Sequence, residues 1–147
     1  MHGRILQIEN HPFKSTTPKL NDLDMMCMND DNYEFQGLHY FDYTRELDGE
    51  EYKENLEGFL KMMEDNDYAD VHRGETPEDT YFTFNNRQNA KLLSEYNKVG
   101  IYDSPRICVV KRMEDGTASM CTFDWWADRF AIPTIRYYVG AMFDVHN

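Results

Sequence analysis

The segment from Asp48 to Asp65 constrains the fold most, because it is apolar on one side and acidic on the other at helical spacing. Its apolar residues are Tyr52, Leu56, Phe59, Leu60 and Met63. At about 100° per residue these side chains share one sector, and the acids fall on the opposite side, namely Glu50, Glu51, Glu54, Glu57, Glu64 and Asp65. Asp48 followed by Glu51 resembles a capping box. The pattern predicts a helix with an acidic outer face.

The net charge of −12 is concentrated in one stretch of the chain. Residues 22–79 hold 19 of the 27 acids and only four bases, so this stretch carries −15, whereas the rest of the chain sums to +3. A charge distribution of this kind steers basic partners toward one side of a protein. It also repels phosphate, and the bases elsewhere form no cluster longer than Lys111-Arg112, so direct nucleic-acid binding is disfavoured.

Length and composition indicate one folded domain over residues 1–147. A chain of this length is typical of a single domain that buries its own core, and an aromatic content of 14% is far from that of disordered chains. Three scattered cysteines favour reduced thiols over a disulfide framework. No signal-length apolar run opens the chain and no stretch approaches a membrane span. We therefore expect a soluble, cytoplasmic protein.

Strand patterns occur on both sides of the predicted helix. Residues 4–8 are typical of a short strand, and residues 33–43 place aromatic side chains at alternate positions. Residues 68–71 and 80–84 favour a strand pair joined by a polar turn, and residues 132–143 favour a final strand with a bulge at Gly140. Trp125 and Trp126 point to opposite faces if the chain is extended there, so one of them is expected in the core.

The clearest hairpin signal is Asp115-Gly116, which separates apolar runs at 107–113 and 118–126. Asp-Gly suits the two left-handed positions of a type I′ turn. A two-residue loop at this point places Val110 opposite Cys121 and Cys108 opposite Phe123. Both thiols are then expected on one apolar face, where packing accounts for them.

The remaining segments complete an α+β fold. Asn85 or Asn86 is expected to cap a second helix that ends near Val99. Residues 14–32 predict a long acidic surface loop, unless the cluster Met25 to Met28 forms a short helix on the core. Because strands and helices do not alternate regularly, we expect a mainly antiparallel sheet of about five or six strands with two helices on one face.

No motif for catalysis or metal binding occurs in the sequence. The histidines and cysteines lack the spacings of zinc sites, and no nucleophile elbow or phosphate loop is present. The acidic run that begins at Asp65 is not an EF-hand, because its sixth position is Asp70 and its twelfth is Thr76. We therefore assign no catalytic, cofactor-binding or metal-ligating residue. The sequence leaves open an acid/base pair formed by two carboxylates that meet in a cleft.

The charge pattern favours a non-enzymatic interaction protein that binds a basic protein surface as an inhibitor or regulator. Such a surface includes the groove of a nucleic-acid-binding protein, which the chain would occupy by mimicry, as phage-type anti-defence proteins do. The expected partner-binding residues are Asp30, Asp31, Glu34, Phe35, Phe41, Tyr43, Glu50, Glu51, Glu54, Glu57, Glu64, Asp65 and Asp67. The alternatives are a small carboxylate-dependent hydrolase or transferase, and a structural or self-associating subunit.

Overall fold

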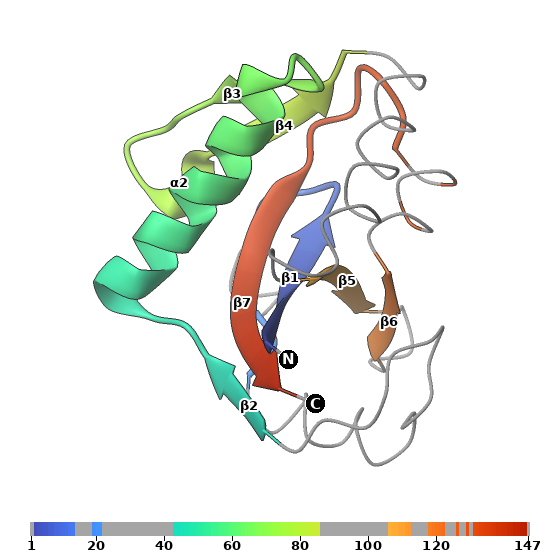
Figure 1. Ribbon diagram of the computed structural model, residues 1–147. Coiled ribbons are helices and arrows are strands. Elements are labelled where there is room, and N and C mark those ends of the chain that lie inside the picture. The colour runs from blue at the N-terminus through green and yellow to red at the C-terminus, as the bar shows by residue number, and fades with distance from the viewer. Residues whose placement is uncertain are drawn as a thin grey trace.

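The computed structural model describes residues 2–13, 19–21, 43–85, 106–112, 118–122, 126, 129 and 131–146. These residues form strands, one α-helix and one short 3-10 helix (Figure 1). In chain order the elements are β1 (His2–Glu9), β2 (Tyr43–Glu46), α2 (Gly49–Asp65), β3 (Ala69–His72), η1 (Pro77–Asp79), β4 (Tyr81–Phe84), β5 (Arg106–Arg112), β6 (Ala118–Thr122) and β7 (Tyr138–His146). The predicted α+β class is confirmed.

The described strands are divided between two sheets. Five of them form one sheet in the order β2-β7-β1-β5-β6, and β3 pairs only with β4. Neighbouring strands are antiparallel except β1 and β5, which are parallel. The prediction of one mainly antiparallel sheet of about five or six strands was therefore wrong about the division into two sheets and missed the parallel pair. An isolated bridge between Phe82 and Tyr137 connects the two sheets.

In the described part of the chain α2 is the one complete α-helix, and Trp126 and Arg129 are also helical, whereas the sequence predicted two helices. The second helix was expected from Asn85 or Asn86 to Val99, and residues 86–105 lie outside the described part. Most of the loop predicted at 14–32 and of the strand predicted at 33–43 also lies outside it. Within that loop Leu20 is described: it is buried, and its N–H donates to Gln7 Oε1 at 2.9 Å. The chain is therefore attached to the core at this point.

The main hydrophobic core lies between α2, the five-stranded sheet and the β3–β4 pair, and α2 runs alongside β7 (Figure 1). The helix contributes Leu56, Phe59, Leu60 and Met63, and the large sheet contributes Leu6, Ile8, Val109, Val139 and Met142. An aromatic cluster made of Phe82, Phe84, Trp126 and Tyr137 has ring centroids 5.3 to 6.0 Å apart. Trp126 is thus buried in the core, but it is helical, so the extended chain expected at this position was wrong. The apolar side of α2 is buried as its periodicity predicted, and its acidic side faces outward.

A β-bulge interrupts β7 where the sequence predicted one. Leu6 pairs with Met142 and Ile8 pairs with Val139, so Gly140 and Ala141 both lie opposite Gln7. The buried Oε1 of Gln7 accepts the Ala141 N–H at 3.3 Å, which supplies a partner for a donor displaced by the bulge. A Cβ at position 140 would meet the Phe13 ring and the side-chain oxygen of Gln7, so at least one of these side chains would have to shift. Glycine fits there because it avoids both contacts.

The predicted antiparallel pairing of the two hairpin strands is confirmed, but its register was wrong by one residue, and the turn expected at Asp115-Gly116 lies outside the described residues. β5 and β6 are antiparallel, with Val110 opposite Met120 and Cys108 opposite Thr122. Cys121 lies opposite Val109, so the two cysteines occupy positions of opposite parity in the ladder. The expected pairings of Val110 with Cys121 and of Cys108 with Phe123 were therefore wrong.

The predicted strand pair at 68–71 and 80–84 is confirmed as β3 and β4. The connection contains η1, which begins at Pro77, in place of a simple turn.

The capping box expected at the start of α2 was wrong. Asp48 is the N-cap residue, but its side chain makes no capping hydrogen bond. The Glu51 carboxylate instead accepts two hydrogen bonds from Arg45 on β2, at 2.6 and 3.0 Å, because β2 lies close to the first turn of α2.

Candidate interaction surface on helix α2

The outer side of α2 carries a row of exposed carboxylates, interrupted by the exposed Lys61, which we call the acidic ridge. It consists of Glu50, Glu54, Glu57, Glu64 and Asp65, all of which are exposed. These positions repeat at three, four and seven residues, so they fall within a sector of about 100° on the helix surface. The buried side chains of α2 occupy the opposite sector. The packing of the apolar side therefore fixes the direction in which the carboxylates point.

The end of α2 is stabilised by hydrogen bonds that turn the chain back toward the helix. The N–H of Asp67 donates to Glu64 O at 3.1 Å and the N–H of Tyr68 donates to Met63 O at 2.9 Å, which is the Schellman pattern. Asp67 occupies the left-handed position with φ 58°. Its Oδ1 and its backbone O also accept hydrogen bonds from the Asn85 side chain at 3.0 and 2.7 Å. Asp67 was predicted to contact a partner, and here it terminates the helix.

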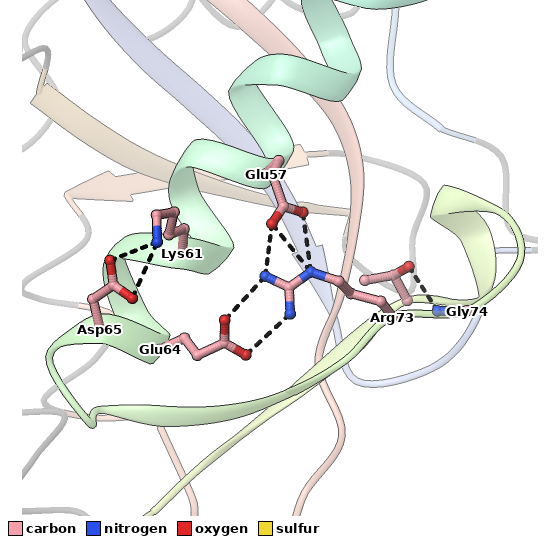
Figure 2. Close-up of polar contacts among 7 residues, drawn as sticks. Glu57, Lys61, Glu64, Asp65, Arg73 and Gly74 are labelled. Atoms are coloured by element: carbon pink, nitrogen blue, oxygen red, sulfur yellow. Dashed lines mark hydrogen bonds and ion pairs between the residues drawn. The ribbon is translucent and has the colours of Figure 1, made fainter.

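Two carboxylates of the acidic ridge hold the side chain of Arg73, which follows β3 (Figure 2). Glu57 accepts hydrogen bonds from Arg73 Nε at 3.1 Å and from Nη2 at 2.7 Å. Glu64 accepts from Nη1 at 3.0 Å and from Nη2 at 3.2 Å. Glu57 and Glu64 are two helical turns apart on the same side of α2, so one guanidinium reaches both. We call Glu57, Glu64 and Arg73 the outer clamp.

Within the outer clamp, the contacts favour the charged forms of Glu57 and Arg73. Hydrogen bonds from Arg73 hold the pKa of Glu57 below its usual range, more strongly than partial desolvation raises it. Hydrogen bonds to Glu57 and then to Glu64 raise the pKa of Arg73 further above neutrality. The lowered pKa of Glu57 favours its ionised carboxylate, which suits an electrostatic surface and not a general acid.

Other ridge carboxylates also have nearby cations, but these contacts are exposed. Lys61 contacts Asp65 at 3.1 Å and Lys53 contacts Glu50 at 3.5 Å, each within the helix (Figure 2 shows the first pair). In the described part of the chain no cation pairs with Glu54, nor with Asp70 or Glu75 beyond the helix. Residues 43–85 contain 13 acids and four bases, so this region keeps a net charge of −9 after its internal pairs are counted.

On its inner side α2 is held by a second set of polar contacts, which we call the inner network. Arg4 on β1 donates from Nη1 to Asp144 on β7 and from Nε to Asn55 Oδ1, the latter at 2.9 Å. The Asp144 side chain is only 11% exposed and that of Arg4 is 24% exposed. Tyr52 also reaches the sheet, because its hydroxyl donates to the carbonyl of Gly140 at 2.7 Å. These contacts attach the helix to β1 and β7.

The structure brings together the helical members of the predicted partner-binding set. Glu50, Glu54, Glu57, Glu64 and Asp65 form the acidic ridge, whereas Glu51 is directed to Arg45 at the edge of the sheet. Asp30, Asp31, Glu34, Phe35 and Phe41 lie outside the described residues. Tyr43 is the first residue of β2, and the position of its side chain is not described.

Sequence reasoning missed the role of Arg73. The seven-residue spacing of Glu57 and Glu64 was a visible signal that one cation could contact both. The cation itself comes from beyond the helix, after the chain has reversed at Asp67 and continued through β3. Lys19 was missed for the same reason: it pairs with Glu78 on η1 at 2.9 Å and lowers the pKa of that carboxyl by hydrogen bonding.

Neither the comparisons with known proteins nor the other features of the described residues assign a family or a second kind of site to this chain. The chain matches no protein-family model, and no curated protein or solved structure is significantly similar to it. Among the described residues no group of three or more His, Cys, Asp or Glu is arranged to hold a metal ion. The helix that the structure describes is too short and too polar to cross a membrane.

Proposed function

We propose that this chain is an acidic interaction protein that binds a basic surface of another protein as an inhibitor or regulator. The proposal depends on one observation: α2 presents five exposed carboxylates along one side while its opposite side is fixed in the core. A partner with clustered arginines or lysines is the class that this surface attracts, because opposite charges steer the encounter and fix its orientation.

The spacing of charge along α2 limits how closely the helix imitates a nucleic acid. Residues 50–65 contain six acids and two lysines over a length of about 22 Å, which leaves roughly one net charge per 5.5 Å. A nucleic-acid strand carries one charge per about 3.4 Å. Strict mimicry of phosphate spacing by α2 alone is therefore not proposed. A nucleic-acid-binding protein remains a suitable partner when its basic surface accepts a sparser row of charges.

Rigidity favours binding by this surface. Met63 and Leu60 anchor one side of α2 in the core, and the inner network attaches it to two strands of the sheet. The helix therefore loses little backbone entropy when a partner binds. Exposed carboxylates of this kind contribute more to association rate and salt dependence than to raw affinity.

The experiment measures binding of a fluorescent peptide of nine arginines by anisotropy at two salt concentrations. The test variant neutralises three ridge acids outside the outer clamp, Glu50→Gln, Glu54→Gln and Asp65→Asn. A matched control neutralises three acids outside the acidic stretch, Glu95→Gln, Asp103→Asn and Glu114→Gln, so the net charge changes equally.

We expect the ridge variant to bind about tenfold more weakly than the wild type, because three exposed charge contacts are each worth up to about 0.5 kcal/mol. The control variant should weaken binding less than about threefold, through its change in net charge alone. Equal weakening in the two variants, or binding that does not change with salt, contradicts the proposal.

A further inference from the structure

Arg73 presents to the acidic ridge the same chemical group that a basic partner would present. Its guanidinium fills the space between Glu57 and Glu64 and donates to all four carboxylate oxygens (Figure 2). A planar guanidinium with several donors fits two carboxylates in this way, and an ammonium group does not. The centre of the ridge is therefore occupied by a residue of the protein itself.

The position of Arg73 allows its side chain to leave. Its side chain is 38% exposed, and those of Glu57 and Glu64 are 53% and 44% exposed. Ion pairs between groups this exposed contribute little to the stability of a fold, because water screens them and long side chains lose entropy when held. Arg73 also lies after the last residue of β3, so its release does not require a ladder hydrogen bond to break.

We propose that Arg73 is an internal competitor that limits access of partner arginines to the acidic ridge. This inference rests on the proposed function of the ridge. A partner arginine that binds Glu57 and Glu64 must displace Arg73, which is present at a high effective concentration because it belongs to the same chain. A partner with a single arginine competes poorly, whereas a partner with several arginines binds the rest of the ridge first and then displaces it.

The competition predicts a preference among partners. Once Arg73 is displaced, Glu57 and Glu64 accept a guanidinium in the two-carboxylate arrangement that they already form. Lysine cannot reproduce these paired hydrogen bonds. Removing Arg73 should therefore strengthen binding of arginine peptides more than binding of lysine peptides of the same length.

The experiment compares Arg73→Gln with Lys53→Gln in binding to peptides of nine arginines or nine lysines. Each variant removes one positive charge near the same helix, but among the described residues Lys53 pairs only with Glu50, in an exposed contact at 3.5 Å. A third variant, Arg73→Lys, keeps the positive charge but loses the planar set of N–H donors of the guanidinium. Circular dichroism and thermal unfolding establish that each variant is folded, with a change in Tm below about 4 °C.

We expect Arg73→Gln to bind the arginine peptide about three- to tenfold more tightly than the wild type, and Lys53→Gln less than about twofold more tightly. The affinity of Arg73→Lys for the arginine peptide should lie between those of the wild type and Arg73→Gln. Equal gains in Arg73→Gln and Lys53→Gln, or weaker binding by Arg73→Gln, would overturn the competition and leave the proposed function standing. If neither the wild type nor any variant binds the peptide, the proposed function fails and the competition fails with it.

Discussion

The inner network and the outer clamp hold α2 with the same kinds of charged groups in different surroundings. In the inner network Arg4 meets Asp144 where both side chains are largely shielded, at 24% and 11% exposure. In the outer clamp Arg73 meets two carboxylates that are about half exposed. A shielded ion pair is costly to break because the remaining charge is left without water, whereas an exposed one is replaced by solvent at little cost. Burial therefore separates the contacts that fix the helix from those that solvent can replace.

The largest expected effect comes from breaking the inner network. Asp144→Ala removes the partly buried carboxylate that accepts a hydrogen bond from Arg4 Nη1 and lies 3.9 Å from Arg45 Nη2. We expect the free energy of unfolding to fall by roughly 2–3 kcal/mol, as measured by urea denaturation. The matched change in the outer clamp, Glu64→Ala, should cost less than about 1 kcal/mol. Similar costs in the two variants would show that burial does not distinguish the two sites.

A smaller loss of stability is expected on removing the Tyr52 hydroxyl, which joins the inner side of α2 to the bulge in β7. Burial raises the pKa of Tyr52, so its hydroxyl stays protonated and donates to the Gly140 carbonyl. Tyr52→Phe should lower the free energy of unfolding by about 1 kcal/mol. Tyr68→Phe is the control, because the hydroxyl of Tyr68 makes no hydrogen bond to the described residues. A loss of the same size in the control would assign the effect to general packing.

The smallest expected effect is the response of the outer clamp to acid. The folded-state pKa of Glu57 is lowered, first by the hydrogen bonds from Arg73, so the clamp contributes stability above the usual carboxyl range. That contribution is lost as the pH falls through the lowered pKa, and it is small because the pair is exposed. Carbon-detected NMR titration of Glu57 should give a lowered pKa in the wild type and a value nearer the usual range in Arg73→Gln. An unchanged pKa in the variant would show that Arg73 does not cause the shift.

The parts of the fold that follow from local pattern were predicted well. The period of Leu56, Phe59 and Met63 determined where α2 lies and which side is buried. The same period predicted six acids on the other side, of which five form the acidic ridge and Glu51 instead contacts Arg45. The β5–β6 hairpin and the bulge at Gly140 also depend on neighbouring residues, and both were found.

The parts that depend on distant residues were missed. The parallel pairing of β1 with β5, the division into two sheets and the one-residue register of β5 against β6 are set by packing over the whole molecule. The capping box failed because Glu51 found a closer partner in Arg45 on β2. Local propensity does not reveal such competition.

The sequence by itself determined that this protein has an acidic helix with a fixed orientation, because side-chain periodicity and charge are properties of neighbouring residues. Only the tertiary structure decided which of those acids meet a cation of the same chain. Arg73 reaches Glu57 and Glu64 after a chain reversal, and Asp144 reaches Arg4 across nearly the full length of the chain. Contacts of this kind follow from how the elements pack, and packing depends on all parts of the fold together.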